Sequence, residues 1–595
     1  MKRDTHLDDL AVAPNPQFVR PGYIDLSGIW RFAFDDENIG LKEHWYANPE
    51  RLRERITVPY PPESSLSGIH DTGYHAVLWY ARQVEIADLT RGERVLLNFG
   101  AVDYEATVWV DGAFVGAHRG GHSPFVFDIT DAPKGEASHW VVVRAFDNPH
   151  DIEQPRGKQD WQSSPHKIWY ERTSGIWQPV WLERSPAVRI ASVFWRFDAG
   201  RWAVDYEIAL SAEPLPGSEL TIALRHDDRV LPETRIVPTS RVIEGTIGLA
   251  GSREQMDPHA LLWAPQRPTL LGSTLTLSAS RQIDDVVEGY LGLRTIELTA
   301  RKVLLNGRPE FLRFVLEQGY WPESQLTAPS PDALKREVEV IQALGFNGAR
   351  IHQKVEDPRF LYWADRLGLL LWGETANSFT YTQQSIAWHA QEWQEIVTRD
   401  RNHPSIISWV PFNESWGVNE LSRSRPQQHA VKAAYHQTHQ HDGSRPVIGN
   451  DGWEHVATDI FTIHDYNWDE DVLRRYYGSD DGLQEAIASH FPASRPLVTG
   501  DYDISGMPVM VTEYGGVSYA PASGEQWYGY GRVNNDAEFI HKYRALTSAL
   551  TDSNLLCGFC YTQLTDTLQE TNGLLTDKRE PKVSIEEIRK ITTGE

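Results

Sequence analysis

The sequence predicts a protein of two β-sandwiches followed by a (β/α)8 barrel. Its 595 residues leave room for about three domains of 100 to 200 residues each. Up to about Thr295 the chain shows short strand segments separated by turn residues, and beyond it apolar strand segments alternate with helical ones. We therefore expect domains over residues 1–186, 187–296 and 297–595.

The first part predicts a β-sandwich between about Asp25 and Arg184. Residues 79–86, 94–99 and 107–110 have the composition of strands, and Asp111-Gly112 is a strong signal for a β-hairpin. Residues 148–166 form a long polar and aromatic stretch between two strands. Loops of this length are often functional, so we expect this one to contribute to a binding site.

The second part predicts another sandwich. Residues 188–193, 202–210 and 220–224 alternate apolar and polar side chains. A stretch of this length and pattern suits an immunoglobulin-like domain. It contains no recognisable set of catalytic residues.

The third part predicts a barrel, because eight strand candidates alternate with helical segments. A helix is expected after the first candidate, since Ser330 fits the N-cap position and Pro331 the first helical position. The eight strand candidates are residues 312–316, 346–351, 369–372, 405–410, 446–449, 459–463, 508–512 and 556–561.

Two of these candidates are followed by a glutamate. Glu414 follows the fourth candidate and Glu513 follows the seventh. These strands lie across the barrel mouth from each other, so the two side chains can converge. Cleavage of a glycosidic bond needs one protonated carboxyl group to assist the leaving oxygen and a second, ionised one. A separation of about 5 to 5.5 Å would give retention of configuration through a glycosyl-enzyme intermediate.

Composition excludes several classes of function. The formal net charge of −25 argues against nucleic acid or an anionic membrane as a partner, since both require basic patches. Residues 1–16 lack the apolar core of a secretory signal, and no run of about 18 apolar residues occurs. We expect a cytoplasmic protein whose partner is a glycoside or oligosaccharide, with homo-oligomerisation left open.

Metal and cofactor chemistry is not indicated by the sequence. Cys557 and Cys560 are the only cysteines and lie in an apolar strand candidate. We expect two buried thiols on opposite faces of that strand. The chain has no HExxH motif and no cluster of His and Cys at ligand spacing, so neither a metal nor a cofactor is expected.

The segment N-H-P-S-I-I-x-W-x-x-x-N-E-S at 402–415, together with V-T-E-Y-G at 511–515, resembles glycoside hydrolase family 2. This family contains β-galactosidases, β-glucuronidases and β-mannosidases. The resemblance extends to residues 26–32, 108–112, 172–177 and 345–350. It implies a galactose-binding-like jelly roll, an immunoglobulin-like sandwich and a catalytic TIM barrel, in that order.

The resemblance also implies residue roles. Glu414 would be the general acid/base, Glu513 the nucleophile, and Asn413 a hydrogen-bond partner of the sugar 2-hydroxyl. Arg350 and Tyr466 would hold and polarise the nucleophile. Further candidates for contact with the sugar are His352, Glu374, Trp416, Asp451, Trp453, His464 and Gln563 at strand ends, with Lys158 and Trp161 on the long loop. Glu374 either binds a sugar hydroxyl or pairs with Arg350.

Substrate specificity is where the chain departs from the best-known members of that family. Glucuronidases of the family bind the substrate carboxylate with an Asn-x-Lys pair, whereas here Asn572 is followed by Leu574 at the lysine position. An aspartate that precedes the Ser-Gly-Ile motif in large galactosidases and glucuronidases is matched by Trp169.

We therefore expect a retaining exo-glycosidase that releases terminal galactosyl-type residues, with the pyranose or furanose form left open. The alternatives follow in order. The first is a β-D-galactofuranosidase or α-L-arabinofuranosidase, the second a β-glucuronidase or β-mannosidase, and the last a non-catalytic carbohydrate-binding protein. Transglycosylation would use the same pair of glutamates as hydrolysis.

Overall fold

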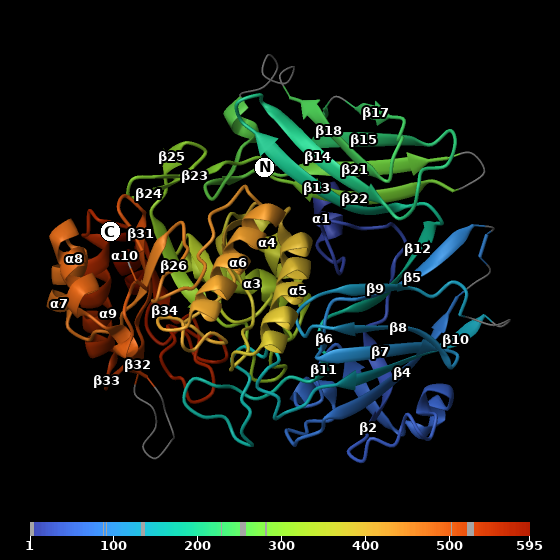
Figure 1. Ribbon diagram of the computed structural model, residues 1–595, viewed down its shortest axis with the longest axis horizontal. Helices are drawn as coiled ribbons and strands as arrows, with labels where there is room; N and C mark the ends of the chain where they lie inside the picture. Colours follow the sequence, from blue (N-terminus) through green and yellow to red (C-terminus); the bar gives the residue numbers. More distant parts are fainter. Residues whose placement is uncertain are drawn as a thin grey trace.

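The computed structural model describes residues 5–86, 89–90, 92–132, 137–227, 229–231, 233–249, 258–279, 283–500, 502–519 and 529–595. Figure 1 shows its three parts: the blue strands of the N-terminal sandwich at the lower right, the green second sandwich above them, and the barrel with its helices at the left. The domain limits after residues 186 and 296 stay a prediction.

Two antiparallel sheets form the N-terminal sandwich, in the orders β3-β2-β4-β10-β7-β8 and β1-β12-β5-β9. Trp30, Leu97 and Val143 belong to the buried cluster of this sandwich. The predicted hairpin is confirmed, since Asp111 and Gly112 join β7 to β8 with φ of 49° and 77°, the positive values that such a turn requires. The strands are β1 (Ile24–Asp25), β2 (Gly28–Phe34), β3 (Glu54–Val58), β4 (Val77–Glu85), β5 (Glu93–Phe99), β7 (Glu105–Val110), β8 (Ala113–Arg119), β9 (Phe125–Asp128), β10 (Ser138–Phe146) and β12 (Val180–Pro186).

The second sandwich packs a sheet ordered β13-β14-β18 against one ordered β16-β15-β21-β22, to which β17 adds. The chain also brings its N-terminal segment here: Val19 pairs with Glu288 of β22, and helix α1 (Thr5–Leu10) places Leu7 in a cluster with barrel residues. The strands are β13 (Ile190–Asp198), β14 (Ala203–Leu210), β15 (Glu219–His226), β16 (Arg229–Val230), β17 (Thr234–Ile236), β18 (Val242–Gly248), β21 (Leu271–Ser278) and β22 (Asp285–Leu291).

Seven parallel strands form the barrel sheet, in the order β29-β28-β27-β26-β34-β31-β30. The predicted β/α alternation is confirmed for seven of the eight strand candidates. The strands are β26 (Leu312–Glu317), β27 (Gly348–Ile351), β28 (Leu370–Glu374), β29 (Ile406–Val410), β30 (Phe461–His464), β31 (Val509–Gly515) and β34 (Leu556–Thr562).

The prediction of a fifth strand at 446–449 is wrong, because this segment does not form a regular strand. It lies beside β29 through isolated parallel bridges, from Trp409 to Val447 and from Asn413 to Asp451. On its other side the amide of His464 donates to the carbonyl of Gly452 at 3.2 Å. Pro446 has no N–H to give to a ladder, so pairing in this segment is local rather than continuous. The segment still fills the place between β29 and β30.

Helices cover the outside of the barrel (Figure 1). The predicted cap is confirmed, because Ser330 Oγ accepts a hydrogen bond of 3.2 Å from the amide of Ala333 at the start of α3. None of the helices within the described ranges is both long and apolar enough to cross a membrane. The barrel helices are α3 (Pro331–Ala343), α4 (Pro358–Leu367), α5 (Gln383–Asp400), α6 (Arg425–His441), α7 (Glu470–Tyr477), α8 (Asp480–Ser489), α9 (Asp536–Thr551) and α10 (Ile585–Thr593).

Cys557 and Cys560 are buried free thiols, as expected, but their predicted placement on opposite faces is wrong. Both pack in one cluster with Phe314 and Trp372. The register of β34 against β31 shifts by one residue between Leu556 and Gly558. Such a bulge interrupts the alternation of side chains, which brings both thiols to the same side.

Candidate active site

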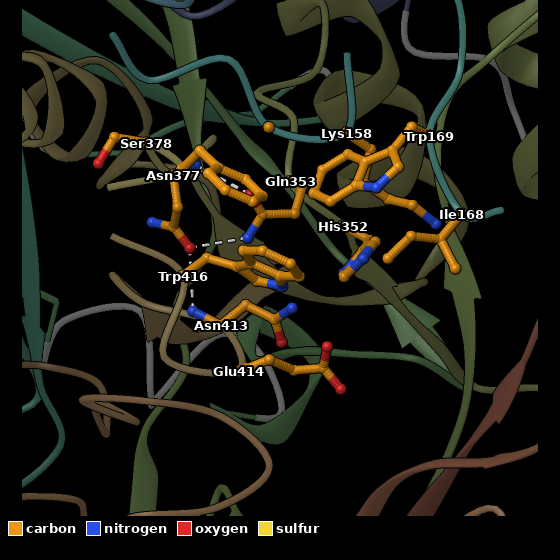
Figure 2. Close-up of a pocket in the computed structure, with 12 residues that line it drawn as sticks. Lys158, Ile168, Trp169, His352, Gln353, Asn377, Ser378, Asn413, Glu414 and Trp416 are labelled. Atoms are coloured by element: carbon orange, nitrogen blue, oxygen red, sulfur yellow. Dashed lines mark hydrogen bonds between the residues drawn. The ribbon is translucent and has the colours of Figure 1, made fainter. Parts of the chain in front are cut away.

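A cavity opens at the carboxyl end of the barrel strands (Figure 2). We call it the mouth cavity. Its residues come from the long loop of the first sandwich and from the segments that follow β27, β28 and β29. The residues that line it are Gly157, Lys158, Ile168, Trp169, His352, Gln353, Asn377, Ser378, Phe379, Asn413, Glu414 and Trp416.

The long loop after β10 is docked on the barrel by backbone hydrogen bonds. The amide of Gly157 donates to the carbonyl of Asn377 at 3.1 Å, and the amide of Phe379 donates to the carbonyl of Ile152 at 3.0 Å. Gly157 has φ of +60°, and a Cβ at this position would lie 2.3 Å from the carbonyl oxygen of Gln353. Only glycine fits such a close approach. The loop therefore forms one wall of the mouth cavity, as its length and composition predicted.

Glu414 is fixed in an unusual backbone conformation. Its φ is 52° and that of Ser415 is 59°, both in the left-handed region that non-glycine residues rarely adopt. The segment beside β29 holds this turn: the amide of Glu414 donates to the carbonyl of Asp451 at 3.0 Å, and the amide of Ser415 to Asn450 Oδ1 at 2.9 Å. Backbone strain of this kind is concentrated at functional sites.

Glu513 belongs to β31, where the register with both neighbouring strands shifts. Arg350 Nη1 donates to its Oε1 at 2.6 Å, and the hydroxyl of Tyr466 donates to its Oε2. Burial opposes ionisation of Glu513, but the positive charges of His464 and Arg350 outweigh it and hold the pKa of this carboxyl below its usual value. Glu513 is therefore an ionised carboxylate at neutral pH.

The two glutamates approach each other through His464. Its Nδ1 lies 2.8 Å from Glu414 Oε1 and 3.5 Å from Glu513 Oε1. One ligand atom of each of the three residues lies within 4.8 Å of the other two. Burial alone would lower the pKa of His464, but the carboxylates of Glu513 and Asp451 raise it to about 10. The protonated imidazole supplies a positive charge between the two glutamates.

Arg350 is the centre of the charge network below the cavity. The side chain is completely buried, and besides Glu513 it contacts Glu374 at 2.8 Å and Asp451 at 3.0 Å. Its Nη2 also donates to Asn413 Oδ1 at 2.6 Å. A guanidinium can only donate, so the amide oxygen of Asn413 must face it. The Nδ2 of Asn413 is then the group left to donate to a ligand in the mouth cavity.

The predicted site residues fall into three groups. Lys158, His352, Asn413, Glu414 and Trp416 line the mouth cavity. Glu513 is not among the lining residues and belongs to the second group, beneath the cavity. The other members of this group contact the two glutamates or each other: Arg350, Tyr466, His464, Asp451 and Glu374. Of the two options for Glu374, pairing with Arg350 is the one observed.

The remaining three predicted residues also lie outside the lining. Gln563 is buried, and its Nε2 donates to Asn572 Oδ1 at 2.7 Å. Trp453 packs edge-on against His464 with ring centroids 5.6 Å apart. Trp161 packs behind the cavity wall, with its ring tilted against that of Phe379 and the ring centroids 4.3 Å apart. These side chains support neighbours of the cavity rather than its surface.

His352 presents a neutral imidazole to the cavity. Burial and the charge of Arg350 hold the pKa of His352 well below its usual value. A neutral imidazole can both donate and accept a hydrogen bond. It therefore suits a hydroxyl group, which has the same two capacities.

Sequence reasoning missed several lining residues that follow β28. Asn377 Oδ1 accepts from the amide of Asn413 at 3.0 Å and from Gln353 Nε2 at 2.8 Å, so it fixes the residue next to Glu414. Phe379 completes an aromatic wall with Trp169 and Trp416, whose ring centroids are 5.0 Å apart. The signal was present, because residues 375–379 directly follow a predicted strand as the other site residues do.

A TIM barrel with two glutamates converging at the carboxyl end of its strands defines a glycoside hydrolase of the two-carboxylate type. Residues 24–186 match the family described as Glycosyl hydrolases family 2, sugar binding domain, and residues 296–594 match the TIM barrel domain of the same family. The chain belongs to glycosyl hydrolases family 2 and is an enzyme with that family's retaining, two-glutamate mechanism. The jelly roll, immunoglobulin-like sandwich and TIM barrel expected from the sequence are confirmed.

Curated relatives carry more than one activity in their names. The chain is 27% identical over 534 residues to a β-glucuronidase of Canis lupus familiaris, which covers 80% of this chain and 77% of that protein. It is 26% identical over 459 residues to a β-galactosidase of Thermoanaerobacter pseudethanolicus, covering 74% of this chain and 56% of that one.

Solved structures agree on the fold. A β-glucuronidase of an uncultured Clostridium sp. superimposes with a TM-score of 0.77 over 96% of this chain and 98% of its own, at 20% identity. A β-galacturonidase from Eisenbergiella tayi gives a TM-score of 0.73 at 18% identity, over 97% of each chain. At such identities the likeness concerns the fold.

Proposed function

We propose that the protein is a retaining exo-glycosidase that releases a terminal, neutral, galactosyl-type sugar. The observation that carries the proposal is the convergence of Glu414 and Glu513 on His464 within 4.8 Å. A close approach of this kind suits attack by one carboxylate and proton transfer by the other, whereas inverting enzymes hold the two carboxyl groups about 6.5 to 9.5 Å apart to admit a water.

In the proposed first step Glu513 attacks the anomeric carbon and forms a glycosyl ester, while the bond to the leaving oxygen breaks. Arg350 and Tyr466 hold the attacking carboxylate, and its lowered pKa keeps it ionised. Asn413 Nδ2 donates to the sugar hydroxyl next to the reacting carbon, a contact that strengthens as positive charge develops on the ring.

Glu414 delivers the proton that the leaving oxygen needs. Once Glu414 has lost this proton, the neighbouring His464 cation stabilises the carboxylate at 2.8 Å. In the second step the same carboxylate takes a proton from water, which attacks the anomeric carbon and releases Glu513. Free sugar and free enzyme result.

Exo-action follows from the shape of the mouth cavity. The loop carrying Gly157 and Lys158 and the aromatic wall of Trp169, Phe379 and Trp416 border the mouth cavity. A cavity closed on these sides suits the end of a substrate rather than the middle of a long chain. A terminal residue therefore enters and the rest of the substrate stays outside.

A neutral sugar is favoured over a uronic acid by Leu574, which stands where family glucuronidases carry their carboxylate-binding lysine. Leu574 is buried in the barrel core and has no charge to offer. The furanose form stays a second candidate, because Trp169 occupies the place of the aspartate found in large galactosidases and gives the wall an apolar surface.

The proposal is tested by nitrophenol release from matched aryl glycosides: β-galactopyranoside, β-galactofuranoside, α-L-arabinofuranoside, β-glucuronide and β-mannoside. We expect the highest kcat/KM on a galactosyl compound. A higher kcat/KM on the galactopyranoside then identifies a pyranosidase, and a higher value on the galactofuranoside identifies a furanosidase. Turnover confined to the glucuronide or the mannoside would overturn the galactosyl specificity.

A further inference from the structure

We propose that Lys158 and Glu570 form a specificity element that selects neutral sugars against uronic acids. The inference rests on the proposed glycosidase function and assigns to it residues that the catalytic steps do not use. Lys158 comes from the loop of the first sandwich and Glu570 from the segment after the last barrel strand, so the element bridges two parts of the chain.

Lys158 enters the mouth cavity from the side opposite Glu414. Figure 2 shows the two residues at opposite edges of the lining, with His352 between them. Lys158 is only 6% exposed, and its backbone carbonyl accepts a hydrogen bond of 2.9 Å from the amide of Tyr170. A lysine held in this way presents its ammonium group to the end of a sugar that lies away from the bond being broken.

Glu570 already neutralises that ammonium group. Its Oε2 lies 2.8 Å from Lys158 Nζ and also accepts from Gln318 Nε2 at 2.9 Å. Glu570 itself is 3% exposed, so this is an ion pair in the interior rather than at the surface. Both hydrogen bonds found for its side chain in the described structure go to Oε2, which leaves Oε1 as an acceptor.

The pair therefore offers the cavity a hydrogen-bond donor without net charge. A sugar hydroxyl in the cavity can accept from Lys158, whose charge Glu570 already balances. A carboxylate would have to displace Glu570 from the lysine or lie unpaired beside it, and an uncompensated buried charge is costly. Leu574 supplies no second cation, and Lys158 is the one Lys or Arg among the described residues that line the mouth cavity.

The experiment measures kcat/KM of the full-length protein for aryl β-galactoside and aryl β-galacturonide, and for their furanose forms if those are the better substrates. We expect the wild type to prefer the neutral sugar by about 100-fold or more. Glu570→Gln keeps the shape of the side chain but frees the charge of Lys158, so the preference should fall at least tenfold. A wild type that prefers the uronide, or a Glu570→Gln variant with an unchanged preference, would overturn the inference.

Two further variants sharpen the result. The double substitution Lys158→Met with Glu570→Gln removes both charges and should restore discrimination against the uronide. Glu580→Gln, at an exposed glutamate of the same segment, should leave the preference unchanged. The double variant remains informative if Glu570→Gln alone fails to fold. A double variant that no longer discriminates against the uronide would overturn the role of the pair.

Inhibition of the wild type by free galactose and galacturonic acid gives an independent measurement. Galacturonic acid should bind at least tenfold more weakly, and equal inhibition would contradict the inference. Absence of turnover on every glycoside would instead refute the proposed function, so the two failures are distinguishable.

Discussion

His464 Nδ1 lies 2.8 Å from Glu414 Oε1, while Nε2 of the same ring lies 3.3 Å from Asp451 Oδ2. One buried imidazole therefore joins the proposed acid/base to a carboxylate beneath the cavity. Glu513 and Arg350 also face the ring, at 3.5 Å and 3.4 Å. This arrangement couples the protonation of His464 to the charge of both glutamates.

Substitution His464→Gln should destabilise the protein more at pH 6 than at pH 9.5. The pKa of His464 is about 10 in the folded protein and about 6.5 in an unfolded chain. The group therefore stabilises the fold fully below about pH 6.5, and this stabilisation is lost as the pH rises through 10. Urea unfolding of both proteins gives the free energy of unfolding that the substitution removes at each pH. This loss should be larger at pH 6 than at pH 9.5 by more than about 1 kcal/mol.

The comparison of wild type and variant at each pH cancels groups that titrate far from His464. The titratable groups that face it directly are Glu414, Glu513 and Asp451, with the guanidinium of Arg350 beside them. An equal loss of stability at pH 6 and pH 9.5 would show that His464 is not protonated in the folded state.

Glu513→Gln should abolish turnover of every glycoside. The amide keeps the shape of the side chain but cannot form the glycosyl ester, so we expect a loss of kcat of at least about 10⁴-fold, and azide should not restore it. Nitrophenol release measures the loss, and Glu580→Gln at an exposed position is the matched control. Residual activity above a few per cent of wild type would contradict the role of nucleophile.

Glu414→Ala should affect substrates according to their leaving group. Aryl glycosides with acidic phenols need little help from an acid and should form the intermediate at a near-normal rate, whereas alkyl glycosides should lose about 10² to 10⁴-fold. Turnover of the aryl compounds should show a burst and should be accelerated by azide, which attacks without a general base. The absence of both effects would remove Glu414 as acid/base.

The barrel and its glutamates were predictable because the signals are local. Glu414 and Glu513 each directly follow an apolar run of strand length, and parallel strands present their carboxyl ends on one face. The fifth strand was not predictable in the same way. Its segment begins with Pro446, and it keeps its place through single bridges to its neighbours rather than through a continuous ladder.

A position at the end of a strand could not predict whether a side chain lines the mouth cavity or lies beneath it. Glu374 and Asp451 follow strand segments as His352 does, yet only His352 reaches the mouth cavity. The difference arises from Arg350, which binds both carboxylates beneath the cavity. The partnership of Lys158 with Glu570 joins residues 412 positions apart, so no local pattern could indicate it.

Arg350→Met should destabilise the fold as well as inactivate the enzyme. Removal of the guanidinium leaves Glu374, Asp451 and Glu513 buried without their shared counter-ion. Breaking a buried ion pair in this way costs about 3 to 5 kcal/mol. Chemical denaturation at pH 7 should show a loss of this size.

Arg544→Met provides the control for that measurement. Arg544 is half exposed and lies 3.9 Å from Glu587, so its removal should change the free energy of unfolding by less than about 1 kcal/mol. If both arginine variants lost similar stability, Arg350 would not be the centre of the network.

Trp169→Ala should identify the ring form for which the aromatic wall is built. The indole of Trp169 packs at 5.0 Å from both Trp161 and Trp416, so its loss opens the wall on the side of the long loop. We expect kcat/KM for the preferred sugar to fall at least about tenfold, equivalent to about 1.4 kcal/mol, while Trp169→Phe keeps most of the activity. If the wall selects five-membered rings, the alanine variant loses furanoside turnover more than pyranoside turnover. Equal losses on both ring forms would show that Trp169 only closes the cavity.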